Sequence, residues 1–247
     1  MNTSAHPTIA LLQSHSLAGV VQQSIEQAIL SGSYPPGAKL NESIFAEQLG
    51  VSRGPVREAF RMLDEAGLVR TAKNRGVFVR DITLAEAAEI FEVRAALEEM
   101  VGRTLASHAN SAQLTEMNGM LDAMQQAVQA DNADDYHQLN LQFHDRLVEM
   151  TGNGRLLAIY RKLIKELSLF RRMNLGHTGA MPTSVQGHRQ IVQTITSGNA
   201  ELAGRAMADH VQGSKQRTMG QDAQIQPSGH TSAITGGNTE PQPNIKF

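Results

Sequence analysis

Residues 40–81 combine two short helical patterns with an extended basic hairpin, an order that few folds accommodate. The second helix is predicted to begin after Ser52, a favourable N-cap. Pro55 falls in its first turn, where a missing amide hydrogen removes no intrahelical bond. Apolar residues then recur every three or four positions until Gly67 ends the pattern. The segment therefore predicts a helix-turn-helix followed by a wing.

Basic side chains occupy a separate face of this second helix. Arg53, Arg57 and Arg61 are each four residues apart, so that they form one row along the helix. An α-helix fits the major groove of DNA, where guanine presents O6 and N7 together to a guanidinium group. The row predicts that Arg53 and Arg57 read bases. Taken alone, an amphipathic helix with solvated arginines explains the row equally well.

The hairpin adds further positive charge. Two extended stretches flank residues 73–76, which places Lys73, Arg75 and Gly76 at the tip of the wing. Residues 53–80 carry a net charge of +4, from seven basic and three acidic side chains, although the whole chain carries −2. The positive footprint is local, as expected of a protein that contacts DNA through one small surface.

The composition excludes several classes of protein. The chain has 247 residues and no cysteine, so that disulfides and thiolate metal sites are excluded. Its beginning lacks the basic start and apolar run of a signal peptide, and no stretch approaches the length of a membrane span. We expect a cytoplasmic protein with no membrane contact.

From residue 83 onward only helical periods are visible, and polar breaks divide them into about six helices. The last residues are rich in Gly, Pro, Gln, Ser, Thr and Asn, a composition typical of disorder. The predicted fold class is therefore mainly α, with an N-terminal winged helix-turn-helix followed by an all-α helical bundle. The predicted parts are a flexible tail (1–14), the winged domain (15–80), the helical domain (83–219) and a disordered tail (220–247).

Three histidines stand on inner faces of the predicted bundle. His188 and His210 each continue an apolar stripe, and His144 lies with Asn140 along the edge of another. Buried polar groups need partners, and three imidazoles with one amide can find them in a shared divalent metal ion. For each histidine alone, a hydrogen bond to a backbone carbonyl in the core is the simpler interpretation.

The segment VSRGPVREAFRMLDEAGLV, residues 51–69, resembles the recognition helix of the GntR family of bacterial transcription regulators. The resemblance implies DNA contacts at Arg53 and Arg57 in that helix, and at Arg75 and Gly76 in the wing. Gly54 stands where the family often has threonine, so that a backbone N–H would have to replace a hydroxyl contact to phosphate.

Residues 83–218 resemble the all-helical FCD effector domain of the FadR-type branch, in its six-helix version. The matching segments are EVRAALEEMVGRTLASHA, NLQFHDRLVEMTGN and GHRQIVQTITSGNAELAGRAMADHV. Many members bind a divalent metal there through an Asp or Asn and three His. The resemblance implies that Asn140, His144, His188 and His210 bind Zn²⁺, with Ni²⁺ or Mn²⁺ as alternatives.

An amide at position 140 in place of aspartate leaves the metal its full double charge among neutral ligands. We therefore predict a small carboxylate as the effector. Arg94 has two possible roles of equal weight. It either clamps the same carboxylate with both arms of its guanidinium or forms a structural ion pair with Glu98.

These patterns predict a ligand-responsive regulator and not an enzyme. It would bind a pseudo-palindromic operator in double-stranded DNA as a homodimer, because two-fold symmetry doubles the contacts of one winged domain. The resemblance implies that it represses a catabolic or transport operon. A small organic acid would release it. Two alternatives stay open: a metal-dependent hydrolase that uses the histidines, and a constitutive DNA-binding regulator with a purely structural metal.

Overall fold

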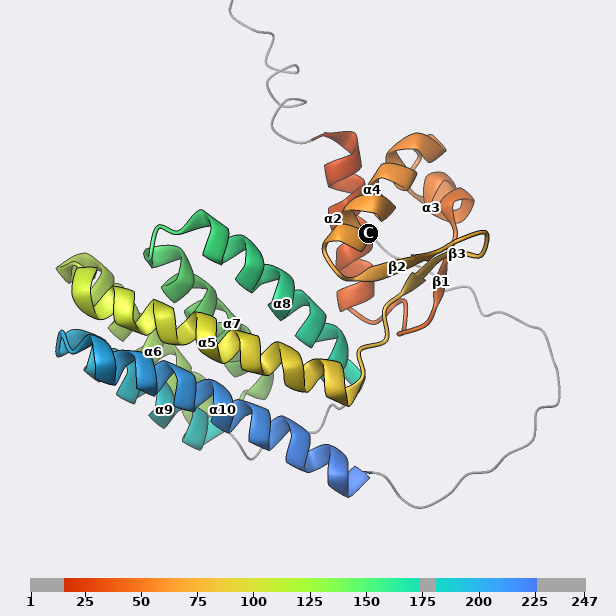
Figure 1. Cartoon of the computed structure of the whole chain (residues 1–247). Helices are drawn as coiled ribbons and strands as arrows, with labels where there is room; N and C mark the ends of the chain where they lie inside the picture. The colour runs from red at the N-terminus through yellow and green to blue at the C-terminus, as the bar shows by residue number, and fades with distance from the viewer. Residues whose placement is uncertain (1–15, 174–180, 226–247) are drawn as a thin grey trace, which may run out of the picture. The chain divides into compact units, whose positions relative to one another are not determined.

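The computed structural model describes residues 16–173 and 181–225 of the chain (Figure 1). Its contacts divide the chain into two compact units, one ending at Ile82 and the other beginning at Thr83. In the described residues the first unit holds a small sheet and the second is entirely helical. The predicted fold class, mainly α with a winged helix-turn-helix followed by an all-α helical bundle, is confirmed.

The first unit contains three described helices and three short strands. In chain order they are α2 (Leu17–Leu30), β1 (Lys39–Leu40), α3 (Glu42–Gln48), α4 (Arg53–Glu65), β2 (Val69–Ala72) and β3 (Gly76–Val79). The sheet is antiparallel with the order β1-β3-β2. The β2–β3 hairpin is the predicted wing. Strand β1 is not visible in the sequence, because two residues are too few to show an alternating pattern.

Local signals define both ends of α4. It begins after Ser52 as predicted, but the Ser52 hydroxyl makes no capping bond. Its usual partner is the amide of the third helical residue, which here is Pro55 and has no N–H. At the other end Gly67 adopts a φ of +76°, and the amide of Leu68 bonds back to the carbonyl of Leu63. This Schellman-type ending turns the chain from the helix into the wing.

The apolar face of α4 holds the first unit together. Val56, Phe60 and Leu63 are buried, and the ring of Phe60 meets that of Phe45 on α3 edge to face at 5.8 Å. Helix α2 covers the same core with Ile25 and other apolar residues at helical spacing. Because this face is buried, the opposite face of α4, which carries the arginines, is exposed.

The second unit contains the six predicted helices in the described residues. They are α5 (Leu84–His108), α6 (Ser111–Gln129), α7 (Ala133–Met150), α8 (Gly154–Met173), α9 (Met181–Thr196) and α10 (Ala200–Ile225). Helix α10 continues past Gly220, where the predicted tail begins, because a single glycine costs a helix only about 1 kcal/mol. The predicted N-terminal tail, and the C-terminal tail from residue 226, lie outside the described residues.

Helix α5 is central to the bundle, since it packs against α7, α8, α9 and α10. It begins with a capping box between Thr83 and Glu86. It approaches α10 closely at Gly102, where a Cβ would overlap the carbonyl of Ala203. The helix also carries two charged side chains, Arg94 and Glu98, into the core.

Candidate metal centre and nucleic-acid interface

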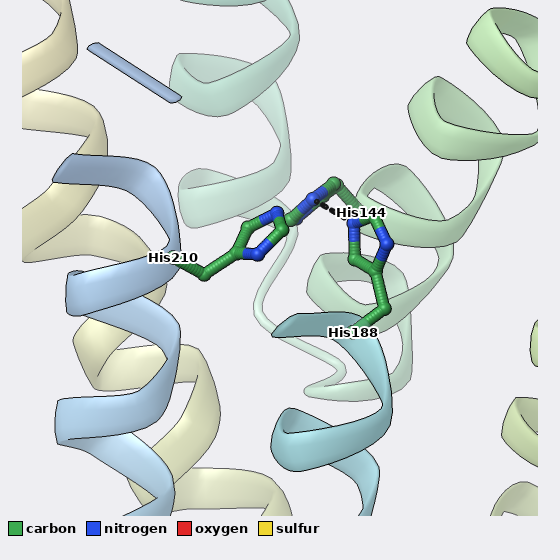
Figure 2. Close-up of side chains that lie close together, drawn as sticks. All are labelled: His144, His188 and His210. Atoms are coloured by element: carbon green, nitrogen blue, oxygen red, sulfur yellow. Dashed lines mark hydrogen bonds between the residues drawn. The ribbon is translucent and has the colours of Figure 1, made fainter. Parts of the chain in front are cut away.

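The side chains of His144, His188 and His210 point toward one another from α7, α9 and α10 (Figure 2). One nitrogen of each lies within 4.8 Å of the others, and Nε2 of His144 is 3.1 Å from Nε2 of His188. Two nitrogens bound to one tetrahedral zinc ion at about 2.0–2.1 Å stand roughly 3.3 Å apart. The geometry of the cluster therefore fits a shared metal ion.

A buried carboxylate determines which nitrogen of His144 is free. Oε2 of Glu98 lies 2.7 Å from Nδ1 of His144, and its Oε1 lies 2.5 Å from Nε of Arg94. Burial alone would raise the pKa of Glu98, but the neighbouring Arg94 and His144 outweigh burial and hold that pKa at about 2. An ionised carboxylate only accepts hydrogen bonds, so that Nδ1 of His144 donates. In the neutral form of the imidazole, Nε2 then presents a lone pair to the cluster.

The structure shows one of the two predicted roles of Arg94. It forms a buried ion pair with Glu98 and is itself only 3% exposed. Arg94, Glu98 and His144 thus form a chain in which each group orients the next. The contact between Glu98 and His144 joins two helices and is not visible in the sequence.

The other two histidines are held in their neutral form. Burial, and then the neighbouring histidines, lower the pKa of His188 well below its ordinary value. Burial and the proximity of His144 lower the pKa of His210 to about 3. Nδ1 of His188 lies 3.4 Å from the hydroxyl of Tyr136, which fixes the orientation of its ring. Neutral imidazoles are the form that binds a metal ion.

A glycine makes room for the third histidine. An ideal Cβ at Gly187 would lie 2.5 Å from Nδ1 of His210, closer than two such atoms can approach. The imidazole of His210 therefore occupies the space that a side chain at position 187 would fill. Asn140, the fourth predicted ligand, is half-buried on α7, one helical turn before His144. Three imidazoles beside an amide are a donor set that suits Zn²⁺ or Ni²⁺.

In the first unit, one acidic residue holds both predicted base readers. Nη2 of Arg57 lies 2.9 Å from Oε2 of Glu42 on α3, and Nη2 of Arg53 lies 3.6 Å from the same oxygen. The hydrogen bond from Arg57 lowers the pKa of Glu42. The side chains of Arg53 and Arg57 remain 62% and 69% exposed. Both guanidinium groups therefore pair with the carboxylate of Glu42 and are still accessible to DNA.

The remaining predicted DNA contacts on α4 differ in their surroundings. Arg61 is exposed and pairs with Glu58 and Glu65 of its own helix, so that it does not share the contact to α3. Gly54 is exposed, and a Cβ there would meet only the hydroxyl of Ser52, at 4.0 Å. The backbone at Gly54 is therefore open to a close approach.

The tip of the wing is a tight exposed turn. Lys73, Arg75 and Gly76 are all exposed, and the amide of Arg75 bonds to the carbonyl of Ala72 at 3.0 Å. Gly76 adopts a φ of +107°, which favours glycine. A Cβ there would lie 3.2 Å from Cε of Lys39 on β1, a basic residue beside the wing that does not stand out in the sequence.

The fold and its sites define a class: a winged helix-turn-helix DNA-binding unit joined to a helical bundle with a buried histidine cluster. Residues 17–79 match the family described as bacterial regulatory proteins, gntR family, and residues 89–213 match the FCD domain. The chain belongs to the GntR family of transcription regulators, in the branch that carries an FCD domain. The predicted resemblance is confirmed.

Known relatives agree with this assignment. A probable D-xylose utilization operon transcriptional repressor of Paenarthrobacter nicotinovorans is 30% identical over 196 residues, covering 79% of this chain and 86% of the relative. The HTH-type transcriptional repressor RspR of Escherichia coli (strain K12) is 28% identical over 177 residues, covering 72% and 78%. These relatives are regulators and not enzymes, which argues against a hydrolase.

Solved structures share the fold. E. coli McbR/YncC superimposes with a TM-score of 0.71 at 20% identity, over 84% of this chain and 99% of that one. A putative GntR transcriptional regulator from Rhodococcus sp. RHA1 gives 0.68 at 26% identity, over 83% and 98%. In the described part of this chain, the helices are all too short or too polar to cross a membrane.

Proposed function

We propose that this protein is a ligand-responsive repressor that binds a pseudo-palindromic operator in double-stranded DNA as a homodimer and is released by a small organic acid. The observation that carries the proposal is the cluster of three converging imidazoles in the unit that follows the DNA-binding unit. A cluster of this kind is more than a bundle needs for packing, since apolar side chains of similar size would fill the space without the cost of burying polar groups.

On the DNA side, Arg53 and Arg57 would leave Glu42 and read guanines in the major groove. Both arms of a guanidinium can bond to O6 and N7, which replaces the bonds to the carboxylate. Gly54 and Arg61 would contact the phosphates beside α4.

In the wing, Lys73 and Arg75 would contact phosphates, and Gly76 would allow the backbone to approach the DNA. These contacts position the protein without reading sequence. An operator in bacterial DNA places this activity in the cytoplasm.

In the bundle, Asn140, His144, His188 and His210 would hold Zn²⁺, with Ni²⁺ or Mn²⁺ as alternatives. These ions accept five or six ligands as well as four, so that a carboxylate oxygen would bind beside the four protein ligands. The chain's own residues prepare the site: Glu98 sets the tautomer of His144, and burial keeps the imidazoles neutral. Arg94, held by Glu98, orients the whole group and stays a candidate for contact with the acid.

Two further features support the proposal. Val93 and Met100, seven residues apart on α5, are 49% and 45% exposed, an apolar stripe of the kind that a dimer interface buries. Among the relatives, the names of the D-xylose repressor and of a gluconate operon repressor from Bacillus licheniformis refer to operons of sugar or sugar-acid use. We infer a catabolic or transport operon as the target.

The experiment is selection of operators from random DNA with the zinc-loaded full chain, at fixed salt. The selected site should be palindromic. Arg53→Ala and Arg57→Ala should each weaken binding to it by about 1–3 kcal/mol and relax one base position per half-site. Arg205→Ala, which removes an exposed arginine of α10, is the control and should bind normally. No selected site, or equal binding by all three variants, would contradict the proposal.

A constitutive regulator with a structural metal is distinguished by melting temperature. The ligand-responsive repressor and the constitutive regulator both predict that a chelator lowers the melting temperature. Only the ligand-responsive repressor predicts that a small acid raises the melting temperature of the zinc-loaded protein.

A further inference from the structure

An open groove of about 590 Å³ lies between α9 and α10, beside the histidine cluster. Six of its ten lining residues have polar side chains. Prominent lining residues are Thr183, Gln186 and Gln190 of α9, and Asp209, His210 and Arg217 of α10. Because His210 belongs both to the cluster and to the groove, a small solute in the groove lies next to the position of the metal.

Arg217 brings a positive charge into this groove. In the described part of the chain no carboxylate lies within ion-pair distance of it, and the one ionisable group that acts on its pKa is the phenol of Tyr136. Arg217 is half-buried, and burial lowers its pKa. Five other arginines of this unit pair with acidic side chains: Arg94, Arg103, Arg146, Arg161 and Arg205. The environment of Arg217 therefore leaves its charge poorly compensated.

The guanidinium of Arg217 points back along α10 toward His210. A Cβ at Gly213 would lie 3.2 Å from Nη1 of Arg217, so that the guanidinium rests against the backbone of Gly213. Gly213 is three residues from His210, which corresponds to about 4.5 Å along the helix axis. A molecule with only a few atoms between two anionic groups spans such a separation.

The charges of the site lead to the same class of molecule. Arg94 and Glu98 cancel as an ion pair, and imidazoles that bind a metal ion are neutral. Asp209 also lines the groove, exposed to solvent, and offsets the charge of Arg217 without pairing with it in the described structure. A divalent ion then leaves two positive charges, which one dianion balances.

We propose that the effector is a short dicarboxylate, with one carboxylate at the histidine cluster and the other on Arg217. The inference rests on the proposed function, because it takes a metal-bound carboxylate as its starting point. A guanidinium donates two parallel N–H bonds to a carboxylate. Arg217 is suited to this contact because no acidic side chain among the described residues takes its donors, whereas Nε of Arg94 is bonded to Glu98.

The test is calorimetric titration of the zinc-loaded full chain with two matched pairs of acids, succinate with butyrate and glutarate with pentanoate. At least one dicarboxylate should bind ten times more tightly than its monocarboxylate partner. Arg217→Gln should remove this preference and weaken the dicarboxylate by about 10- to 100-fold, the loss expected for a charge-assisted pair, while the monocarboxylates are unchanged. Arg205→Gln, the same change at an exposed site of the same helix, should leave all four affinities as they are.

Each other outcome has a distinct meaning. Equal binding of the paired acids, or Arg217→Gln binding dicarboxylates as the wild type does, overturns the role of Arg217 but leaves the metal-bound carboxylate standing. Failure of all four acids to bind, although zinc binds, overturns both the inference and the proposed effector class. Melting temperature and zinc affinity verify that the variant is folded. Arg217→Lys keeps the charge but loses the two-armed geometry, so that its loss of dicarboxylate affinity should be intermediate. This variant replaces Arg217→Gln in the test if the glutamine variant does not fold.

Discussion

Replacing Glu98 by glutamine tests whether a buried carboxylate prepares the metal site. Glutamine has the same shape and can still accept a bond from Nδ1 of His144, but it removes the charge that faces Arg94. Removing one partner of a buried pair costs about 3–5 kcal/mol, because the other charge stays buried without compensation. Loss of a group that orients a metal-binding histidine lowers metal affinity by about 10- to 100-fold. We expect both losses in Glu98→Gln.

Two measurements check this prediction: urea unfolding of chelator-treated protein, and competition of the protein with a chelator for zinc. The adjacent Glu99→Gln is the matched control, since Glu99 pairs with Arg103 at a partly exposed site. Its stability should change by less than about 1 kcal/mol, and its zinc affinity should be unchanged. If Glu98→Gln loses stability but keeps the zinc affinity of the wild type, Glu98 supports only the fold and the reasoning about His144 is refuted.

Three further predictions follow from single contacts. Gly187→Ala should lower zinc affinity by about tenfold or more by displacing His210, whereas Gly119→Ala, at a helical glycine with open space, should not change zinc affinity. In chelator-treated protein the pKa values of His188 and His210 lie below their unfolded value of about 6.5. The stability from their neutral forms should therefore be lost as pH falls below about 6.5, by up to about 1.4 kcal/mol per pH unit for each histidine. Urea unfolding at pH 8, 6.5 and 5.5 measures this, and equal stabilities would contradict it. Glu42→Gln should raise affinity for random duplex DNA at fixed salt and reduce the preference for the operator, as measured by fluorescence anisotropy; unchanged affinity for random DNA would show that Glu42 does not restrain the arginines.

The parts of the fold that depend on local signals could be predicted from the sequence. Helix α4 follows from the spacing of its apolar residues and from Ser52 and Gly67 at its ends. The breaks in the bundle follow from polar and glycine-rich segments. Strand β1 could not be predicted in this way, since it exists only by pairing with β3.

The candidate site shows the same division. Its three histidines stand out because they interrupt apolar stripes, and the structure brings them together. The residues that orient the histidines or make room for them do not stand out in the sequence. Glu98 is 46 residues from His144, and Gly187 matters only because α9 packs against α10. The surroundings of Arg217 likewise depend on helix packing, because it lines a groove between α9 and α10. The ion pair of Arg94 does not, since Glu98 lies four residues away on the same helix.

The central claim is that the histidine cluster controls DNA binding, and one measurement tests it most directly. Operator affinity of the zinc-loaded protein should be measured with and without a saturating concentration of whichever panel acid binds most tightly. The account predicts that the acid weakens operator binding at least about fivefold, and that operator DNA weakens acid binding by the same factor. An acid that binds the cluster and leaves operator affinity unchanged would contradict the account.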